Sequence, residues 1–336
     1  MNVTRRTMMA VAGAGLATGL LPRGALAQAV LPRMRVLIDN DFGADPDGLF
    51  QLAHSLLSPS IDVRGLIGSH VHATPDMLPN DGHQAEKSAA KAAELMELMK
   101  LPARPPVVHG SETALDLNRR GGRSAAVDMI VREALRTDTT LPLYYCAGAG
   151  LTDLAQAWLA EPRIGKRLRL VWIGGSEHPG TAPMPPGEGP GEYNLTIDRA
   201  AAQVVFGQSD IEIWQIPRNA YRQMLVSLAE LREIARLGPV GAWLVAQVDH
   251  VRAMTTAFGI NTGETYVLGD SPLVTMTALQ ASFQPDPASS DYITRPTPRI
   301  ADDGSYVARA DGRPMRVYTR IDMRLTFADM VAKLRG

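Results

Sequence analysis

The sequence predicts an α/β fold in which a mostly parallel central sheet is flanked by helices. Short apolar runs, typical of buried strands, alternate along the chain with longer amphipathic stretches at helical spacing. This alternation indicates βαβ units, which build a parallel sheet. No internal repeat and no shift in composition divides residues 33–336, so we expect them to form a single domain.

Five runs are predicted to be buried strands because they are short and dominated by aliphatic or aromatic residues. In chain order they cover residues 35–38, 63–67, 141–145, 168–173 and 211–214. In a sheet of this kind, ligands bind at the carboxyl ends of the strands, near the point where the strand order reverses. We therefore expect the functional site directly after one or more of these strands.

Four stretches between the strands have helical spacing and cover residues 49–57, 84–99, 124–136 and 200–206. The Pro- and Gly-rich segment 179–191, PGTAPMPPGEGPG, follows a strand. We expect it to be a long loop acting as an active-site flap, and a plain surface loop is the alternative. After Gln280 the composition indicates irregular structure before a final strand and helix.

The N-terminal residues 1–28 resemble a twin-arginine secretory signal. Arg5 and Arg6 precede the apolar stretch VAGAGLATGLL, and Ala25-Leu26-Ala27 forms a small-x-small cleavage site. The apolar stretch is too short and too rich in glycine for a good membrane span. We expect export to a bacterial periplasm and no stable span after cleavage. An ordinary secretory signal or an uncleaved anchor is the alternative.

The overall composition excludes several classes of partner and site. A formal net charge of -1 gives no electrostatic reason to expect nucleic acid as a partner. The single cysteine, Cys146, rules out an internal disulfide and a cysteine-based zinc cluster, and we expect it to be a buried small residue.

Four aspartates follow the first predicted strand within nine residues: Asp39, Asp41, Asp45 and Asp47. Carboxylates this close repel one another unless some hold a proton or a cation neutralises them. Hard oxygen ligands favour Ca²⁺ or Mg²⁺. An EF-hand loop is excluded because Gly43 stands where its third acid belongs. A charged turn with a helix cap is the structural alternative, but it explains only one aspartate.

A strand followed by Asp-x-Asp also occurs in haloacid-dehalogenase-like phosphatases. In that interpretation Asp39 is the nucleophile, Asp41 the acid, and Gly269-Asp270-Ser271 a late metal motif. The second acid that normally follows such a motif is absent, because Pro272-Leu273-Val274-Thr275 comes next. No convincing lysine follows a strand in the middle of the chain.

A set of motifs in the same order resembles the inosine-uridine-preferring nucleoside hydrolases. The family signature Asp-x-Asp-Pro-Gly-x-Asp-Asp-Ala is similar to the aspartate stretch. Further resemblances are VRGLIGSHVH (63–72), AGAGLTDLA (147–155), VWIGG (171–175), EYN (192–194) with DRAA (198–201), and GDSP (269–272). The resemblance runs from about residue 33 to the end and implies the Rossmann-like fold of that family.

The resemblance also implies roles for individual residues. It makes Asp41 both a calcium ligand and the general base on the attacking water. Asp47, Asp270 and the backbone carbonyl of Thr152 become the other calcium ligands, with Mg²⁺ the less favoured ion. The implied sugar-binding residues are Asp45, Glu192, Asn194 and His72, and Asp39 supports the site from behind. Asp198 is expected to cap a helix rather than to contact the sugar.

Two departures from the family pattern bear most directly on the site. Pro46 separates Asp45 from Asp47, where the family has adjacent aspartates, so the register of these two residues stays open. Gly269 replaces a histidine that in many members helps the departing base to leave. His70, His72 and His178 are candidates to take over this role, although a surface or structural imidazole is the better interpretation of each.

We therefore expect a calcium-dependent hydrolase of N-glycosidic bonds in ribonucleosides or related ribosides. The expected partner is a small-molecule riboside, and the family resemblance suggests a homo-oligomer. Carboxylates, a metal and hydrogen bonds to the ring hydroxyls suit the oxocarbenium-like transition state of such a reaction. A non-catalytic periplasmic riboside-binding protein is the alternative, because it would keep the same metal site.

Overall fold

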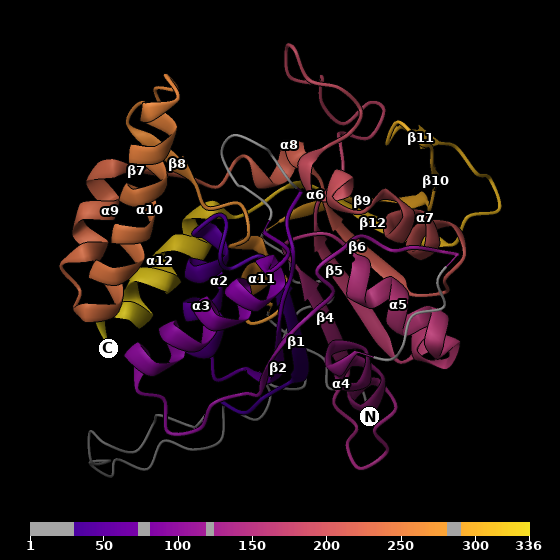
Figure 1. Ribbon diagram of the computed structural model, residues 1–336, viewed down its shortest axis with the longest axis horizontal. Coiled ribbons are helices and arrows are strands. Elements are labelled where there is room, and N and C mark those ends of the chain that lie inside the picture. Colours follow the sequence, from indigo (N-terminus) through magenta and orange to yellow (C-terminus); the bar gives the residue numbers. More distant parts are fainter. Residues whose placement is uncertain (1–29, 73–80, 119–123, 281–289) are drawn as a thin grey trace, which may run out of the picture.

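The computed structural model describes residues 30–72, 81–118, 124–280 and 290–336 (Figure 1). The predicted signal segment 1–28 lies outside the described residues. The main sheet has eight strands in the order β3-β2-β1-β4-β5-β6-β12-β9. All neighbouring strands in it are parallel except β9, which runs antiparallel to β12. The predicted mostly parallel α/β fold is confirmed.

The strands of this sheet are β1 (Met34–Asn40), β2 (Ile61–Gly68), β3 (Val107–His109), β4 (Leu143–Ala147), β5 (Leu168–Ile173), β6 (Glu212–Ile216), β9 (Asp291–Pro296) and β12 (Pro314–Arg320). Two small antiparallel pairs join β7 (Leu225–Ser227) to β8 (Thr265–Val267) and β10 (Arg299–Ile300) to β11 (Tyr306–Val307).

The helices are α2 (Asp47–Leu56), α3 (Gln84–Met99), α4 (Ala125–Ala134), α5 (Thr152–Ala160), α6 (Tyr193–Ile197), α7 (Arg199–Gly207), α8 (Arg218–Tyr221), α9 (Leu228–Ala235), α10 (Pro239–Ala257), α11 (Pro272–Thr275) and α12 (Met323–Arg335). In Figure 1, α2, α3, α9, α10 and α12 lie on one side of the sheet, and α4, α5 and α7 lie on the other. Each side buries its own hydrophobic cluster.

The strand order reverses next to β1. From β1 the chain builds outward to β2 and β3, then returns to place β4 on the other side of β1. A crevice forms at such a reversal because the loops after the two neighbouring strands diverge to opposite faces. The aspartate-rich loop after β1 and the glycine-rich turn after β4 therefore meet at this edge of the sheet.

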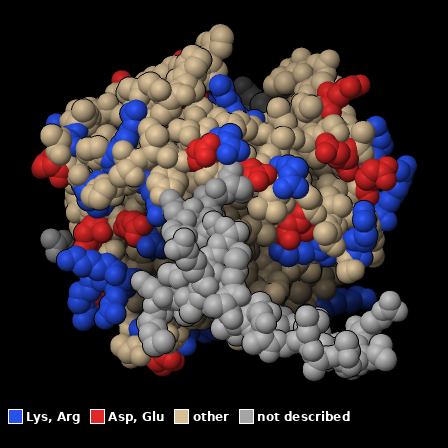
Figure 2. Space-filling view, turned by 180° about the vertical axis from the view of Figure 1, so that it is seen from behind, with Lys and Arg blue, Asp and Glu red and all other residues tan. Residues whose placement is uncertain are grey.

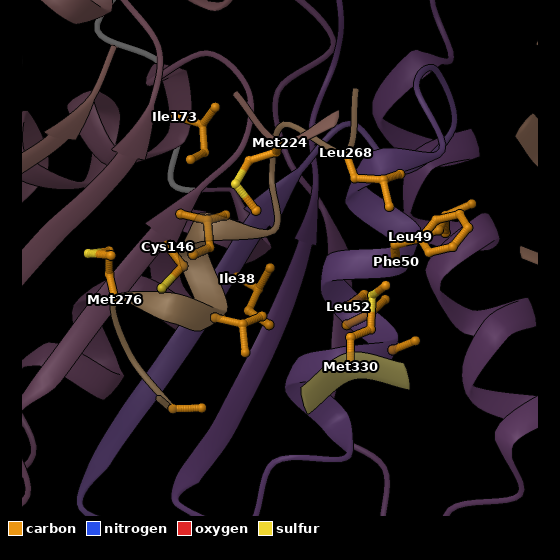
Figure 3. Packing of buried hydrophobic residues seen from close by; sticks show 14 of the residues in the cluster. Ile38, Leu49, Phe50, Leu52, Cys146, Ile173, Met224, Leu268, Met276 and Met330 are labelled. Carbon is orange, nitrogen blue, oxygen red and sulfur yellow. The ribbon is translucent and has the colours of Figure 1, made fainter. Parts of the chain in front are cut away.

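Tight packing fixes the strand ends from which the site is built (Figure 3). Ile38 of β1, Cys146 of β4 and Ile173 of β5 are almost fully buried and belong to one cluster with Leu49 and Phe50 of α2. Cys146 is thus a buried small residue, as predicted, and burial raises the pKa of its thiol. Such cores resist displacement because their side chains are close-packed.

Most predicted elements occur where the sequence placed them. The helix at 84–99 and the strand at 168–173 have the predicted bounds, and the other predicted elements differ at their ends. The expectation of irregular structure after Gln280 was wrong in part, because β9 adds an antiparallel edge strand there. The helices α9 and α10 were missed, although the Ser227–Glu230 capping box and Gly238-Pro239 mark where they begin.

The surface agrees with the near-neutral net charge. On the face drawn in Figure 2, Lys and Arg side chains are interspersed with Asp and Glu rather than gathered into one large patch. Among the described residues, no helix combines the length and the apolar character needed to cross a membrane.

Candidate active site

A cavity of about 380 Å³ opens at the carboxyl ends of β1, β4 and β5. Its walls are strongly acidic, and two arginines, Arg218 and Arg222, also line it. The cavity therefore brings the predicted aspartates together with Asp270, more than 220 residues away in the chain. The acidic lining residues are Asp41, Asp45, Asp47, Glu188, Glu192 and Asp270.

The loop between β1 and α2 presents three of these aspartates to the cavity. The backbone of Asp41 and Ala44 forms a turn, with a hydrogen bond of 2.8 Å from the Ala44 N–H to the Asp41 carbonyl. Asp45 accepts hydrogen bonds from the Asp47 N–H at 3.2 Å and from the Tyr266 hydroxyl at 2.9 Å. Asp45 and Asp47 both line the cavity, so the residue between them does not remove either from the site.

Asn40 ties the two halves of the acidic cluster together, and sequence reasoning missed it. Its Oδ1 accepts from the Asp41 N–H at 2.9 Å, and its Nδ2 donates to Asp270 Oδ2 at 2.8 Å. The side chain is fully buried and fits only because its neighbours are Gly48 and Gly148. A Cβ atom on Gly148 would lie 2.4 Å from Asn40 Nδ2. The only available signal was its position inside the run Asp39-Asn40-Asp41.

The aspartates of the cluster resist ionisation. Burial raises the pKa of Asp41 to about 8, and the negative charges of Asp45 and Asp39 add to the shift. Burial and neighbouring carboxylates likewise hold the pKa values of Asp47 and Asp270 well above the usual range. These shifts have the sign expected for clustered carboxylates that no positive charge compensates.

The donor chemistry of this wall fits a hard divalent cation. The carboxylates of Asp41, Asp47 and Asp270 are oxygen ligands of the type that Ca²⁺ takes, and the lining residue Gly148 adds a nearby backbone carbonyl. As the described side chains stand, no three of His, Cys, Asp and Glu are grouped so that they could hold a metal ion. The carboxylates would therefore have to converge on the ion as it binds.

Asp39 lies behind the cavity wall. It is buried in β1 and accepts hydrogen bonds from the hydroxyls of Ser69 and Tyr145. Burial raises its pKa to about 6, while the two hydrogen bonds act in the opposite direction. The side chain holds β1 to its two neighbouring strands, which matches a supporting position.

Glu192 and Asn194 come from the start of α6 and line the cavity together with the aspartates. Glu192 Oε2 accepts from the N–H groups of Gly175 and Leu195, and its Oε1 accepts from the Tyr221 hydroxyl at 2.8 Å. Asn194 Nδ2 donates to the carbonyls of Gly148 and Ile173, both at 2.9 Å. Its amide hydrogens are thus engaged, and Oδ1 is the atom suited to accept from a ligand hydroxyl.

The structure does not bring Thr152 to the cavity, in contrast to its predicted role as a carbonyl ligand. Thr152 is the first residue of α5, and its hydroxyl donates to Asp198 Oδ2 at 2.7 Å. Gly148, four residues earlier, lines the cavity instead. Asp198 caps α7 through the Ala201 N–H, as expected.

The predicted histidines also lie outside the cavity. His72 is exposed at the end of the described segment 30–72 and is not a lining residue. His70 is buried against the Ser111 carbonyl. His178 stacks on Tyr306 and contacts Gln215 Oε1 at 2.8 Å, and burial lowers its pKa to about 4. The interpretation of these imidazoles as surface or structural groups fits their places.

The 179–191 loop reaches the cavity through Pro185 and Glu188, as expected for a flap. Arg218 of α8 anchors it: its guanidinium contacts Glu188 Oε2 at 2.9 Å and Glu177 Oε2 at 2.7 Å. Sequence reasoning missed Arg218, Tyr221 and Arg222. These three residues lie in the segment PRNAYRQ, which directly follows β6. Its place after a parallel strand could have indicated them, because the carboxyl end of β6 lies on the same edge of the sheet as the site.

Known proteins similar to this chain share its fold. The family model described as "Inosine-uridine preferring nucleoside hydrolase" matches residues 36–333. Among solved structures, a plant nucleoside hydrolase superposes with a TM-score of 0.66 at 19% identity, covering 91% of this chain and 100% of its own. The inosine-uridine preferring nucleoside hydrolase from Bacillus anthracis gives 0.64 at 18% identity, covering 90% and 99%.

A purine-preferring ribonucleoside hydrolase from Gardnerella vaginalis gives a TM-score of 0.64 at 16% identity, covering 90% of this chain and 98% of its own. No curated protein sequence matches the chain significantly. At these identities the solved structures show a shared fold, whereas the family model covers most of the sequence itself.

Proposed function

Since this chain belongs to the inosine-uridine preferring nucleoside hydrolase family, we propose that it is a calcium-dependent hydrolase in which Asp41 activates the attacking water. Family membership makes the chain a glycosidase acting on N-glycosyl compounds and speaks against the phosphatase interpretation. The observation that carries the finer proposal is the buried carboxylate cluster of Asp41, Asp47 and Asp270 in one cavity wall, tied together by Asn40.

Asp41 is suited to act as the general base. It is the first aspartate after the end of β1, lines the cavity, and has its backbone N–H fixed by Asn40 Oδ1. Without a cation, burial and the charges of Asp45 and Asp39 raise the pKa of Asp41. A calcium ion bound beside Asp41 would lower this pKa and hold the carboxylate in the ionised form that accepts a proton. A water molecule that loses its proton to Asp41 becomes the nucleophile at the anomeric carbon.

The sugar would lie between the aspartate loop and α6. Asp45 and Asn194 both line the cavity and offer a carboxylate and the amide Oδ1 as acceptors for ribose hydroxyls. Glu192 Oε1 accepts from the Tyr221 hydroxyl and keeps a second lone pair for a ribose hydroxyl. Hydrogen bonds of this kind strengthen as positive charge develops on the ring in the transition state.

Asp41, Asp47 and Asp270, with the Gly148 carbonyl, would hold the calcium ion. Bound there, Ca²⁺ supplies charge neutralisation for the cluster and a Lewis acid that lowers the pKa of the attacking water. Gly148 is proposed as the carbonyl ligand because it lines the cavity, whereas Thr152 does not. We also propose that the mature chain works in the periplasm, on the strength of the twin-arginine-like segment.

Ribose release from inosine, uridine and p-nitrophenyl riboside tests the proposed function. We expect release of ribose from at least one riboside in the presence of calcium and loss of that activity on chelation, with recovery when calcium is returned. Binding of calcium and ribosides without ribose release would instead identify a non-catalytic riboside-binding protein. Phosphate release from phosphomonoesters is expected to stay at background.

Replacing Asn40 by alanine is expected to weaken calcium binding by roughly 10- to 100-fold, because the Asp270 carboxylate loses the donor that orients it. Isothermal titration with calcium measures the change. The matched control is Asn118→Ala, an exposed asparagine that does not line the cavity, which should leave the affinity unchanged. An Asn40→Ala protein with wild-type affinity and a wild-type melting temperature would show that Asn40 does not orient the site.

A further inference from the structure

We propose that the preferred substrates of this site are N-ribosyl pyridinium compounds, cationic ribosides whose leaving group departs without taking up a proton. The inference rests on the proposed hydrolase function and specifies its substrate class. Three features of the cavity carry it: the absence of an imidazole, the engagement of its other proton-bearing groups, and the excess of carboxylates on its walls.

All seven histidines of the chain lie in the described residues, and none of them lines the cavity. Histidine is the side chain best matched to deliver a proton near neutral pH. A purine or pyrimidine leaves as a poor anion unless it is protonated as the bond breaks. This cavity therefore offers such a base no imidazole to assist its departure.

Among the described residues, the tyrosines and arginines that line the cavity are poorly suited to act as the acid. The Tyr221 hydroxyl already donates its hydrogen to Glu192 Oε1, so Glu192 serves as an acceptor there. Burial, and then the charges of Asp41, Asp45 and Glu192, raise the pKa of Tyr193 and disfavour formation of its tyrosinate. Guanidinium groups do not give up a proton in proteins.

Tyr221 also closes the wall at Gly269. A Cβ atom built on Gly269 would lie 3.2 Å from both Tyr221 Cδ2 and Asp47 Oδ2. The phenol ring of Tyr221 thus occupies the space into which a side chain at position 269 would project. The packing of the cavity therefore leaves no room for a proton-donating side chain at position 269.

The charge of the walls favours a cationic ligand. Six carboxylates face two guanidinium groups, and Arg218 is already paired with Glu188 and Glu177. A bound divalent cation still leaves negative charge in excess. The rings of Tyr193 and Tyr221 line the same cavity and add surfaces on which a flat cationic ring can stack.

The reaction balances without an acid. Water attacks the anomeric carbon of the riboside while the bond from this carbon to the ring nitrogen breaks. The electron pair of that bond stays on the nitrogen, so the pyridinium leaves as a neutral pyridine. Asp41 takes the proton that the water loses, and the products are ribose and the free pyridine.

Three classes of substrate test separately whether the site prefers a cationic riboside and whether it lacks an acid for the leaving group. Nicotinamide riboside carries a cationic ring that departs as a neutral pyridine without a proton. The neutral p-nitrophenyl group departs without a proton as a stabilised anion, whereas the bases of inosine and uridine need a proton. We expect the kcat/KM of the calcium-loaded enzyme for nicotinamide riboside to exceed those for inosine and uridine by at least about 100-fold, the usual contribution of a general acid. It should also exceed that for p-nitrophenyl riboside.

Inosine or uridine cleaved within about tenfold of nicotinamide riboside would overturn the inference and leave the proposed hydrolase intact. A p-nitrophenyl riboside preferred over nicotinamide riboside would overturn the selection for a cation. Failure to cleave any of the three classes, with calcium bound, would remove the proposed function and this inference together.

A designed pair of variants tests the missing acid directly. Tyr221→Ala alone opens the space beside Gly269, and Gly269→His with Tyr221→Ala places an imidazole in that space. Relative to the single variant, we expect the double variant to gain at least about tenfold in kcat/KM on inosine and far less on nicotinamide riboside. An equal change on both substrates would contradict the inference. If the double variant fails to fold, the substrate comparison on the unmodified enzyme decides alone.

Discussion

Replacing Asp41 by asparagine is expected to lower kcat for riboside hydrolysis by roughly 10³- to 10⁴-fold. The substitution preserves the size of the side chain but removes both the proton acceptor and a carboxylate ligand of the proposed ion. Because Asp41 lies at the end of a strand whose other residues are fully packed, the remainder of the cavity should keep its shape. Steady-state release of ribose, measured at saturating calcium, quantifies the loss.

The control for this substitution is Asp249→Asn, which makes the same chemical change on the exposed surface of α10 and should retain full activity. Calcium titration of the Asp41→Asn protein separates its two effects, because a lost ligand weakens affinity whereas a lost base lowers kcat at saturation. An Asp41→Asn enzyme with more than about a tenth of the wild-type kcat would exclude Asp41 as the general base.

In the absence of calcium, the protein is expected to become less stable as the pH rises from about 5 to 8. The pKa of Asp41 is raised from 3.8 to about 8 by burial and by neighbouring aspartates, so the folded protein binds a proton that the unfolded chain has lost in this interval. That contribution to stability is complete below the unfolded-state pKa and disappears as the pH passes the folded-state pKa. For Asp41 alone the change is on the order of 4 kcal/mol.

Thermal unfolding in chelator, followed across this pH range, measures the effect, and a fall of about 10 °C in melting temperature is expected for a chain of this size. Saturating calcium should remove most of the fall, because the ion neutralises the ionised cluster and binds it more tightly at higher pH. The Asp41→Asn protein should show a shallower decline in chelator. A calcium-free melting temperature that rises over the same interval would contradict the interpretation of the cluster as uncompensated charge.

The fold was largely predictable because its signals are local. Apolar composition predicts the buried strands at 35–38 and 168–173, and helical periodicity predicts the helix at 84–99. Elements with weak local signals were not predicted. Strand β3 is only three residues long, and the edge strand β9 mixes exposed and half-buried positions. The pairing of β9 with β12 depends on contacts between segments that are not adjacent in the sequence.

The candidate site was predictable where its chemistry is concentrated in the sequence. The four aspartates at the end of β1 and directly after it predicted a cation site, and the resemblance to a known family added Asp270 and the Glu192-Tyr193-Asn194 segment. Thr152 and His72 are not among the residues that line the cavity, so their predicted roles stay predictions.

The sequence by itself determined the α/β class, the acidic loop at the end of the first strand and the kind of cation that such oxygens favour. These depend on residue type and on spacing within a few positions. Only the tertiary structure decided that Asn40 joins Asp41 to Asp270, that Gly148 rather than Thr152 lines the cavity, and that Tyr221 stands against Gly269. The physical reason is that these contacts join chain segments up to 230 residues apart, and close packing of the sheet and its helices sets which atoms meet.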